Sequence, residues 1–224
     1  MDTDVIVVED VAAEFSERVV EAFHHRQAES FSVALSGGST ARRCYERLAI
    51  DGADQIDWWQ VDIYWGDERC VAPDDVDSNE RLVRESLLVR VGAANAVYPM
   101  RCLEGPDPYQ QRIASVGRLD LVHLGLGPDG HTASLFPASD ALDADPGRLV
   151  ALNSDPSGRN RHDRMTLTLS GLARARQIIF TVEGSAKREA FAAAMAGDPA
   201  SPAARVAADH IVWLVDPAAA GRIS

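Results

Sequence analysis

The sequence has few cysteines, and none of them is paired in a pattern typical of metal binding or redox chemistry. Cys44, Cys70 and Cys102 are odd in number, far apart and without a CxxC spacing. Zinc sites and disulfide-rich scaffolds use closely spaced or even sets of cysteines. We therefore expect three reduced, partly buried thiols, with neither a disulfide framework nor a zinc site.

Long apolar runs and an excess of positive charge are also missing. No apolar run reaches the roughly 18 residues of a membrane span, and the acidic start MDTDVIVVED is unlike a signal peptide. The 22 Lys and Arg against 34 Asp and Glu give a net charge of -12, which repels nucleic acids and anionic membranes. We expect a cytoplasmic protein without nucleic-acid or membrane partners, in which any anionic ligand needs a locally basic pocket.

The overall pattern is that of an α/β protein. Hydrophobic residues make up 46% and charged residues 25% of the 224 positions, and no linker divides the chain, so we expect one domain over residues 1–224. Strand-like runs alternate with helical periodicities, which predicts a mainly parallel sheet with helices on both faces, a three-layer α/β/α arrangement. The expected strands include 5–8, 31–35, 61–65, 97–100, 149–152, 177–182 and 210–215; the expected helices include 11–23, 41–49, 77–91, 106–116, 171–176 and one opening at 184.

The stretch Leu119 to Pro137, LDLVHLGLGPDGHTASLFP, has the pattern most typical of a functional site. An apolar run of strand length opens into a glycine-rich loop, as a buried parallel strand does at its end. Ligands bind at the carboxyl ends of the strands in an open α/β sheet. In this loop His131 can move a proton near neutral pH, and Asp129 could orient it.

A second candidate is the segment Ser36-Gly37-Gly38-Ser39-Thr40, which follows one predicted strand and precedes a helix. A glycine-rich turn at a helix N-terminus presents free N–H groups, and its hydroxyls add donors for a phosphate. A tight turn with an ordinary Ser or Thr cap would look the same. The Walker lysine and the GxGxxG spacing of nucleotide sites are absent. A serine hydrolase is also disfavoured, because the loose nucleophile elbow ALSGG has no clear Asp and His partners.

Charged residues at two other predicted element ends are open to two interpretations. Asp67 and Arg69 follow the strand predicted at 61–65, where they could face a ligand or form a solvated loop. Lys187 lies in the first turn of a predicted helix, where the helix dipole disfavours a cation. Taken alone, this position favours an amine that extends into solvent over one that binds an anion.

Five segments in this order resemble the family of 6-phosphogluconolactonases. They are ALSGGST at 34–40, WGDER at 65–69, GLGPDGHTASLFP at 125–137, RMTLTL at 164–169 and GSAK at 184–187, of which the third is the most specific. The resemblance implies a hydrolase without metal or cofactor that converts 6-phospho-D-glucono-1,5-lactone to 6-phosphogluconate in the pentose phosphate pathway. It also implies the fold shared with glucosamine-6-phosphate deaminases.

The resemblance also implies roles for individual residues. The segment 36–40 would hold the phosphate and sugar together with Arg69, Arg164 and Lys187, and His131 would be the general base. This chain has Arg161-His162-Asp163 before Arg164, where the family often has prolines.

Lactone hydrolysis needs a deprotonated water and donors that stabilise the oxyanion. Asp129 or Asp67 could raise the basicity of His131 and fix its tautomer. The N–H groups from Gly127 to Gly130 could serve the oxyanion.

Two rival functions remain open at this level. Glucosamine-6-phosphate deaminases resemble the chain in the glycine-rich loop and the DGH triplet, but they carry a Glu where this chain has Phe136. Related domains also occur as sugar-phosphate sensors in transcription regulators. The acidic chain lacks the basic segment that DNA binding would need.

Overall fold

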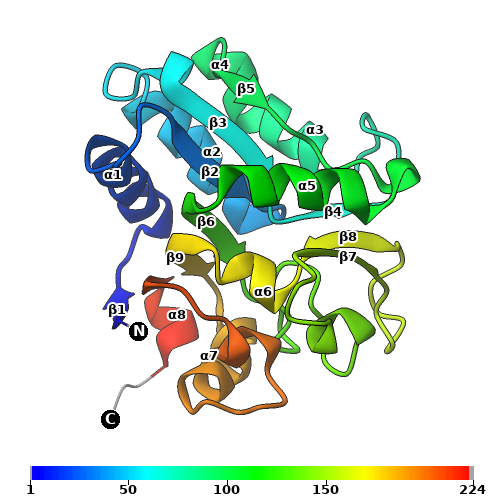
Figure 1. Ribbon diagram of the computed structural model, residues 1–224. Helices are drawn as coiled ribbons and strands as arrows, with labels where there is room; N and C mark the ends of the chain where they lie inside the picture. Colours follow the sequence, from blue (N-terminus) through cyan, green and yellow to red (C-terminus); the bar gives the residue numbers. More distant parts are fainter. Residues whose placement is uncertain (1, 222–224) are drawn as a thin grey trace.

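A seven-stranded parallel sheet forms the centre of the computed structural model, which describes residues 2–221 (Figure 1). Its strand order is β1-β10-β9-β6-β2-β3-β5, and every neighbouring pair is parallel. The strands are β1 (Asp2–Val7), β2 (Phe31–Leu35), β3 (Val61–Trp65), β5 (Ala96–Val97), β6 (Leu119–Gly125), β9 (Ala175–Val182) and β10 (His210–Val215). The predicted α/β class is confirmed.

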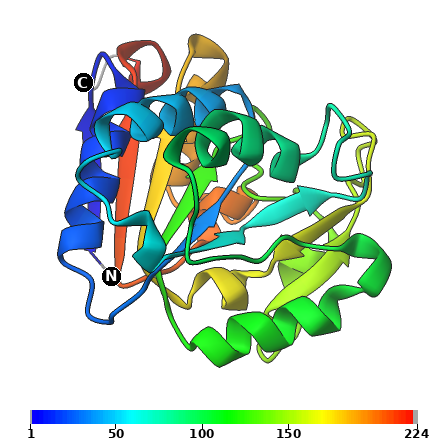
Figure 2. The same ribbon diagram turned by 90° about the horizontal axis from the view of Figure 1, so that it is seen from above.

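Helices cover both faces of this sheet. They are α1 (Val11–His24), α2 (Ser39–Asp51), α3 (Asn79–Val83), α4 (Val89–Val91), α5 (Pro106–Val116), α6 (Leu169–Leu172), α7 (Arg188–Met195) and α8 (Pro217–Ala220). Figure 2 shows α1, α2 and α3 on one side of the strands, and α5 and α6 on the other. This two-sided cover explains why the inner strands are nearly continuous apolar runs. None of the helices within residues 2–221 is long and apolar enough to cross a membrane.

A second, antiparallel sheet lies beside the first and has the order β4-β8-β7. Its strands are β4 (Asp67–Arg69), β7 (Val150–Asn153) and β8 (Arg164–Leu167). β4 continues the chain from β3 after Gly66, so it carries its charged side chains past the end of the central sheet. The strand expected at 149–152 therefore exists, but it pairs outside the parallel sheet.

The helix predicted from Asp77 begins at Asn79, and its cap is Ser78. The reason is the carboxylate of Glu68 in β4, which is 5% exposed and accepts the N–H groups of Asn79 and Glu80 at 2.7 Å each. A buried carboxylate from another element thus binds the N–H groups at the start of this helix, and its cap is Ser78 and not Asp77. A π-helical turn at Arg84–Leu88 connects α3 to α4.

Two other expectations about the helices need correction. The helix predicted at 171–176 is the short α6 at Leu169–Leu172, and β9 already begins at Ala175. The helix predicted to open at 184 begins with a 3-10 turn at Ser185–Lys187, and α7 itself starts at Arg188. Both errors concern element ends, where apolar periodicity is least informative.

Individual side chains fix the ends of the first helix and the interior of the last strand. Asp10 caps α1 through its side chain, and His24 and His25 at the other end are exposed. Trp213 of β10 is 3% exposed and stacks on Phe180 of β9 with ring centroids 3.8 Å apart. Such an aromatic pair adds about 1 kcal/mol to the free energy of burial.

Cys70 and Cys102 form a disulfide, so the prediction of three reduced thiols is wrong. Cys70 directly follows β4, and Cys102 begins a 3-10 turn at Cys102–Glu104, with the two Cα atoms 5.4 Å apart. The two cysteines are 32 positions apart in sequence, and only the folded chain brings the end of β4 beside the segment that follows β5. Cys44 stays free, and burial raises the pKa of its thiol to about 12.

We predict that loss of this disulfide lowers the free energy of unfolding by about 3 to 4 kcal/mol, because the bond restrains a long loop in the unfolded chain. Denaturant unfolding of Cys70→Ser, Cys102→Ser and the double variant is the measurement. If the disulfide forms, the three variants are equally destabilised and match the wild type under reductant. Additive effects, with a wild type that is insensitive to reductant, would contradict it.

Candidate functional site

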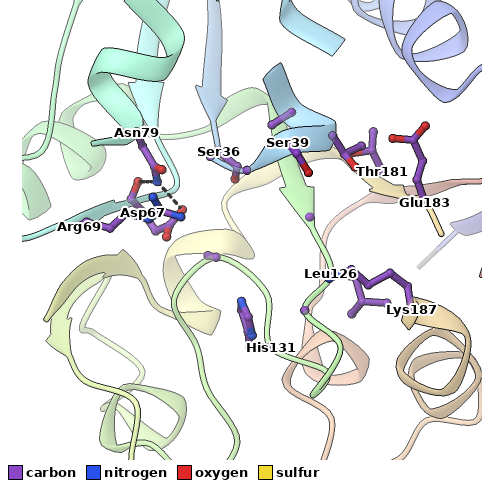
Figure 3. A pocket seen from close by; sticks show the side chains of 17 residues that line it. Ser36, Ser39, Asp67, Arg69, Asn79, Leu126, His131, Thr181, Glu183 and Lys187 are labelled. Atoms are coloured by element: carbon purple, nitrogen blue, oxygen red, sulfur yellow. Dashed lines mark hydrogen bonds between the residues drawn. The ribbon is translucent and has the colours of Figure 1, made fainter. Parts of the chain in front are cut away.

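The candidate residues surround a cavity of about 210 Å³ at the carboxyl ends of β2, β6 and β9, with β4 as a further wall (Figure 3). Parallel pairing places these strand ends at one edge of the sheet. The cavity is lined by Ser36 to Ala41, Asp67, Arg69, Asn79, Gly125 to Gly127, His131, Ala133, Thr181, Glu183 and Lys187. The structure thus brings together most of the residues that the sequence suggested.

The glycine-rich loop between β2 and α2 forms one side of the cavity. All of residues 36–40 line it. The cap of α2 is Gly38, with a φ of 104° and no side-chain hydrogen bond, so the ordinary Ser or Thr cap is not formed. The N–H groups of the first helical turn and the hydroxyls of Ser39 and Thr40 can therefore donate to an anion in the cavity.

Gly37 allows the side chain of Asn79 to lie directly against this loop. A Cβ at position 37 would lie 1.8 Å from Oδ1 of Asn79. Asn79 is 1% exposed, and its Nδ2 donates to the backbone oxygen of Asp67 at 2.9 Å. The sequence did not mark Asn79, because an Asn at a helix start usually has only a local role.

The ring of His131 stands at the cavity and is oriented by Asp129. Its Nδ1 lies 2.6 Å from Oδ1 of Asp129, which also accepts the backbone N–H of His131 at 3.2 Å. The side-chain hydrogen bond is the main reason why the pKa of Asp129 is lowered, so this carboxyl stays charged. A charged carboxylate favours the proton on Nδ1 and leaves the lone pair of Nε2 available to a ligand.

The backbone of the loop around His131 is held by its own hydrogen bonds. The N–H of Gly127 donates to the oxygen of His131 at 2.7 Å, and the N–H of Gly130 donates to the oxygen of Gly127 at 3.0 Å. Both donors are therefore occupied within the loop, so neither is free to donate to an oxyanion in this conformation. A Cβ on Gly127 would lie 2.1 Å from Nδ1 of His131, so glycine is required there. Ala133 has a φ of 46°, an unusual conformation for alanine that often occurs at functional sites.

Asp67 lies on the cavity wall, but its hydrogen bonds lead away from His131. It is 6% exposed, and its Oδ2 accepts the hydroxyl of Ser134 at 2.6 Å. Its Oδ1 accepts Nδ2 of Asn79 at 3.3 Å. Of the two carboxylates that were considered, Asp129 orients the histidine, and Asp67 ties β4 to neighbouring loops.

Arg69 and Arg164 face each other across β4 and β8, where they are paired in register. Arg69 lines the cavity and donates to the backbone oxygen of Asp77. Arg164 is 6% exposed, donates to the oxygen of His162 at 2.8 Å, and is not among the residues that line the cavity. Burial, followed by the charge of Arg69, lowers the pKa of Arg164. Arg164 therefore lies beside Arg69 on the neighbouring strand, and the expectation that it borders the cavity is not met.

Lys187 is the only lysine in the sequence, and it borders the cavity on the side away from Arg69 (Figure 3). It ends a 3-10 turn at Ser185–Lys187, directly before α7. Burial lowers the pKa of its amine, and the charge of Asp129 partly offsets this effect. A half-buried amine at a cavity favours the anion-binding interpretation over extension into solvent.

Three further positions differ from the sequence-based expectation. Gly130, with a φ of 84°, packs against Ser201 behind the cavity wall and does not line the cavity. Thr181 and Glu183 do line it, although nothing in the apolar pattern of β9 marks them. Within residues 2–221, no group of three His, Cys, Asp or Glu side chains is placed to hold a metal ion.

Comparisons with known proteins agree with the resemblance in the five motifs. A family model described as "Glucosamine-6-phosphate isomerases/6-phosphogluconolactonase" matches residues 3–213. The chain is 35% identical over 217 residues to the 6-phosphogluconolactonase of Nostoc sp., covering 89% of this chain and 87% of that one. It is also 35% identical over 211 residues to the 6-phosphogluconolactonase of Mycobacterium leprae, covering 85% and 84%. The crystal structure of 6-phosphogluconolactonase from Thermotoga maritima has a TM-score of 0.85 and 28% identity, covering 96% of this chain and 100% of that one.

The contact between Gly37 and Asn79 leads to a prediction about stability. Gly37→Ala should lower the free energy of unfolding by about 1 to 3 kcal/mol, because the new methyl group overlaps an amide that Asp67 holds in place. Gly66→Ala is the matched control, since a Cβ there meets nothing closer than Ser36 Oγ at 3.6 Å. Denaturant unfolding of both variants is the measurement. Equal stability of the two would show that Asn79 moves aside freely.

Proposed function

Because the chain belongs to the glucosamine-6-phosphate isomerase/6-phosphogluconolactonase family, we propose that it hydrolyses 6-phospho-D-glucono-1,5-lactone to 6-phosphogluconate. The observation that carries this proposal is the His131–Asp129 pair beside a glycine-rich anion loop in one cavity. Lactone hydrolysis needs a base, an anion site and a stabilised oxyanion. The cavity contains groups suited to each of these roles.

In the proposed reaction His131 acts first as a base and then as an acid. Its Nε2 takes a proton from a water molecule, whose oxygen attacks the lactone carbonyl carbon and forms a tetrahedral oxyanion. When the oxyanion collapses, the bond between this carbon and the ring oxygen breaks. Nε2 then returns the proton to the ring oxygen, which becomes the hydroxyl of the product. Asp129 stabilises the imidazolium that exists between these two steps.

Opposite walls of the cavity are assigned to the two negatively charged groups, the phosphate of the substrate and the oxyanion that forms during the reaction. The phosphate is assigned to residues 37–40 and Lys187, which combine helix-start N–H groups, hydroxyls and an amine. Ser36 lines the same loop, but its N–H donates to Tyr45 and its hydroxyl donates to the backbone oxygen of His123 at 2.7 Å. Since the N–H groups of Gly127 and Gly130 are occupied, the oxyanion is assigned to the positive charge of Arg69 on the opposite wall. Arg164, paired in register with Arg69, adds a second positive charge to this wall. Asp67 fixes this wall through Ser134 and Asn79.

Position 136 favours lactone hydrolysis over the alternative of an amino-sugar deaminase. Phe136 stands where deaminases carry their Glu, is 1% exposed, and packs against His131 with ring centroids 5.1 Å apart. Ring opening and loss of an amine require an additional acid or base, which phenylalanine cannot supply. An apolar ring next to His131 suits a reaction in which a single base is sufficient.

The organisation and location of the protein belong to the same proposal. We assign residues 1–224 to one catalytic domain. The family model matches residues 3–213, and the residues that line the cavity extend from Ser36 to Lys187. We assign the enzyme to the cytoplasm, since a phosphorylated sugar does not cross membranes unaided. The disulfide between Cys70 and Cys102 is unusual in that compartment.

We predict that His131→Ala lowers the kcat of lactone hydrolysis by about 10² to 10⁴-fold, because the base and acid steps both lose their group. Hydrolysis is measured against a buffer blank, since δ-lactones also open without enzyme, and glucosamine 6-phosphate is assayed in parallel. His24→Ala, on the exposed end of α1, is the control and should keep full activity. Near wild-type turnover by His131→Ala would remove His131 as the base.

We predict that Lys187→Ala weakens binding of 6-phosphogluconate about ten- to hundredfold, the effect of losing a charged hydrogen bond. The melting temperature should change little or rise slightly, because burial lowers the pKa of this amine and its charge does not stabilise the free protein. Calorimetry with 6-phosphogluconate and with gluconolactone, which should bind poorly to both forms, is the measurement.

Arg188→Ala is the control for the removal of one positive charge. Arg188 is the next residue, and its guanidinium bonds the oxygen of Ala218 outside the cavity. If both variants lost affinity equally, or if Lys187→Ala only lowered the melting temperature, Lys187 would not belong to the phosphate site.

A further inference from the structure

A second histidine, His123 of β6, lies completely buried beneath the cavity and takes no part in the proposed reaction. Its Nδ1 is 2.8 Å from the hydroxyl of Tyr45 in α2, and its Nε2 is 2.9 Å from Oγ1 of Thr181 in β9. Burial lowers the pKa of this imidazole to about 3, so the ring is neutral at physiological pH. A neutral imidazole has one donor and one acceptor nitrogen.

Both partners of His123 lead to the cavity. The hydroxyl of Tyr45 accepts the N–H of Ser36 at 2.8 Å and lies 3.0 Å from the oxygen of the same residue, at the start of the glycine-rich loop. Thr181 forms part of the cavity wall, on the side of Ser39 and Lys187 (Figure 3). The ring of His123 therefore connects two separate parts of the region assigned to the phosphate.

The proton of His123 can occupy either nitrogen, with different consequences for Thr181. With the proton on Nδ1, the ring donates to Tyr45, Tyr45 donates to the oxygen of Ser36, and Thr181 donates to Nε2. With the proton on Nε2, the ring donates to Thr181 and Tyr45 donates to Nδ1. In this second arrangement the hydroxyl proton of Thr181 is free to point into the cavity.

A bound phosphate distinguishes between these two arrangements. In the first, Thr181 presents only lone pairs to the anion, which repels it. In the second, Thr181 presents a donor, and hydrogen bonds to a charged acceptor are roughly twice as strong as neutral ones. The thiol of Cys44 is also close to Thr181, but sulfur is a weak acceptor and competes poorly with a phosphate oxygen.

We propose that Thr181 is a further substrate-binding residue, which donates its hydroxyl proton to the bound phosphate while His123 carries its own proton on Nε2. This inference rests on the proposed function, because it takes the ligand to be a sugar phosphate. His123 acts as a positioning residue, since it touches Thr181 and not the substrate. Ligand binding thereby changes the hydrogen bond between Tyr45 and the glycine-rich loop.

Calorimetry with 6-phosphogluconate tests the role of Thr181. Thr181→Val keeps the shape and removes the hydroxyl, and should weaken binding at least about tenfold. Its kcat should be nearly unchanged at saturating lactone, because the lost contact is present in ground and transition states alike. Thr181→Ser should bind nearly as well as the wild type, and Cys44→Ala should bind normally.

A double variant shows whether Thr181→Val binds weakly because it lacks the contact with the phosphate or because the protein is less stable. Thr181→Val leaves Nε2 of His123 buried without a partner, which lowers stability. His123→Leu together with Thr181→Val replaces both partners with apolar groups, while Tyr45 still donates to Ser36. The double variant should therefore regain stability and still bind 6-phosphogluconate weakly. If it regains affinity as well, or if Thr181→Val binds normally, the role of Thr181 is overturned.

The protonated nitrogen of His123 can be measured directly. It should change on ligand binding only if Thr181 and His123 respond to the phosphate, and not if they have a purely structural role. Nitrogen NMR of ¹⁵N-histidine-labelled protein, with His123 assigned through its Leu variant, should show Nε2 protonated in the complex with 6-phosphogluconate. A complex that has the proton on Nδ1 overturns the proposal even if Thr181→Val binds weakly. A wild-type protein that binds no 6-phosphogluconate overturns the proposed function itself.

Discussion

The parallel pairing of β6 between β2 and β9 is the constraint on which the site depends. Gly125 at the end of β6 is in register with Thr181 of β9, and Val33 of β2 is in register with Leu121. These pairings bring the glycine-rich loop, the loop of His131 and the segment before α7 to one edge of the sheet. Each of the three loops supplies one kind of group, and none of them forms the cavity alone.

The charge of the protein makes this local arrangement necessary. A net charge of -12 opposes the approach of a phosphate, so attraction must come from short-range donors. The chain has arginine at every basic position except 187, where the cavity holds its one lysine. Lysine presents a compact charge with three donors and changes its pKa readily when it is buried. Arg69, on the opposite wall, offers a planar group that its neighbours hold in place.

Two histidines eight residues apart show how environment separates chemical roles. His131 leaves the strand end and meets the charged Asp129, which makes it suitable as a base. His123 stays inside the sheet, where burial keeps it neutral and its partners are hydroxyl groups. A neutral ring between hydroxyls can exchange its donor and acceptor sides without gaining charge. Such a ring is suited to transmitting ligand binding between two loops.

The sequence by itself determined the α/β class and the strand ends at which the cavity lies, and it marked His131 as a candidate base, because apolar periodicity and glycine-rich turns are local properties. It did not reveal the partner of Cys70, the place of Arg164 beside Arg69, or the contact of Asn79 with the glycine-rich loop. These depend on β4 turning away from the central sheet to pair with β8. Only the tertiary structure decides such contacts, because they join residues far apart in the chain whose types carry no pattern of their own.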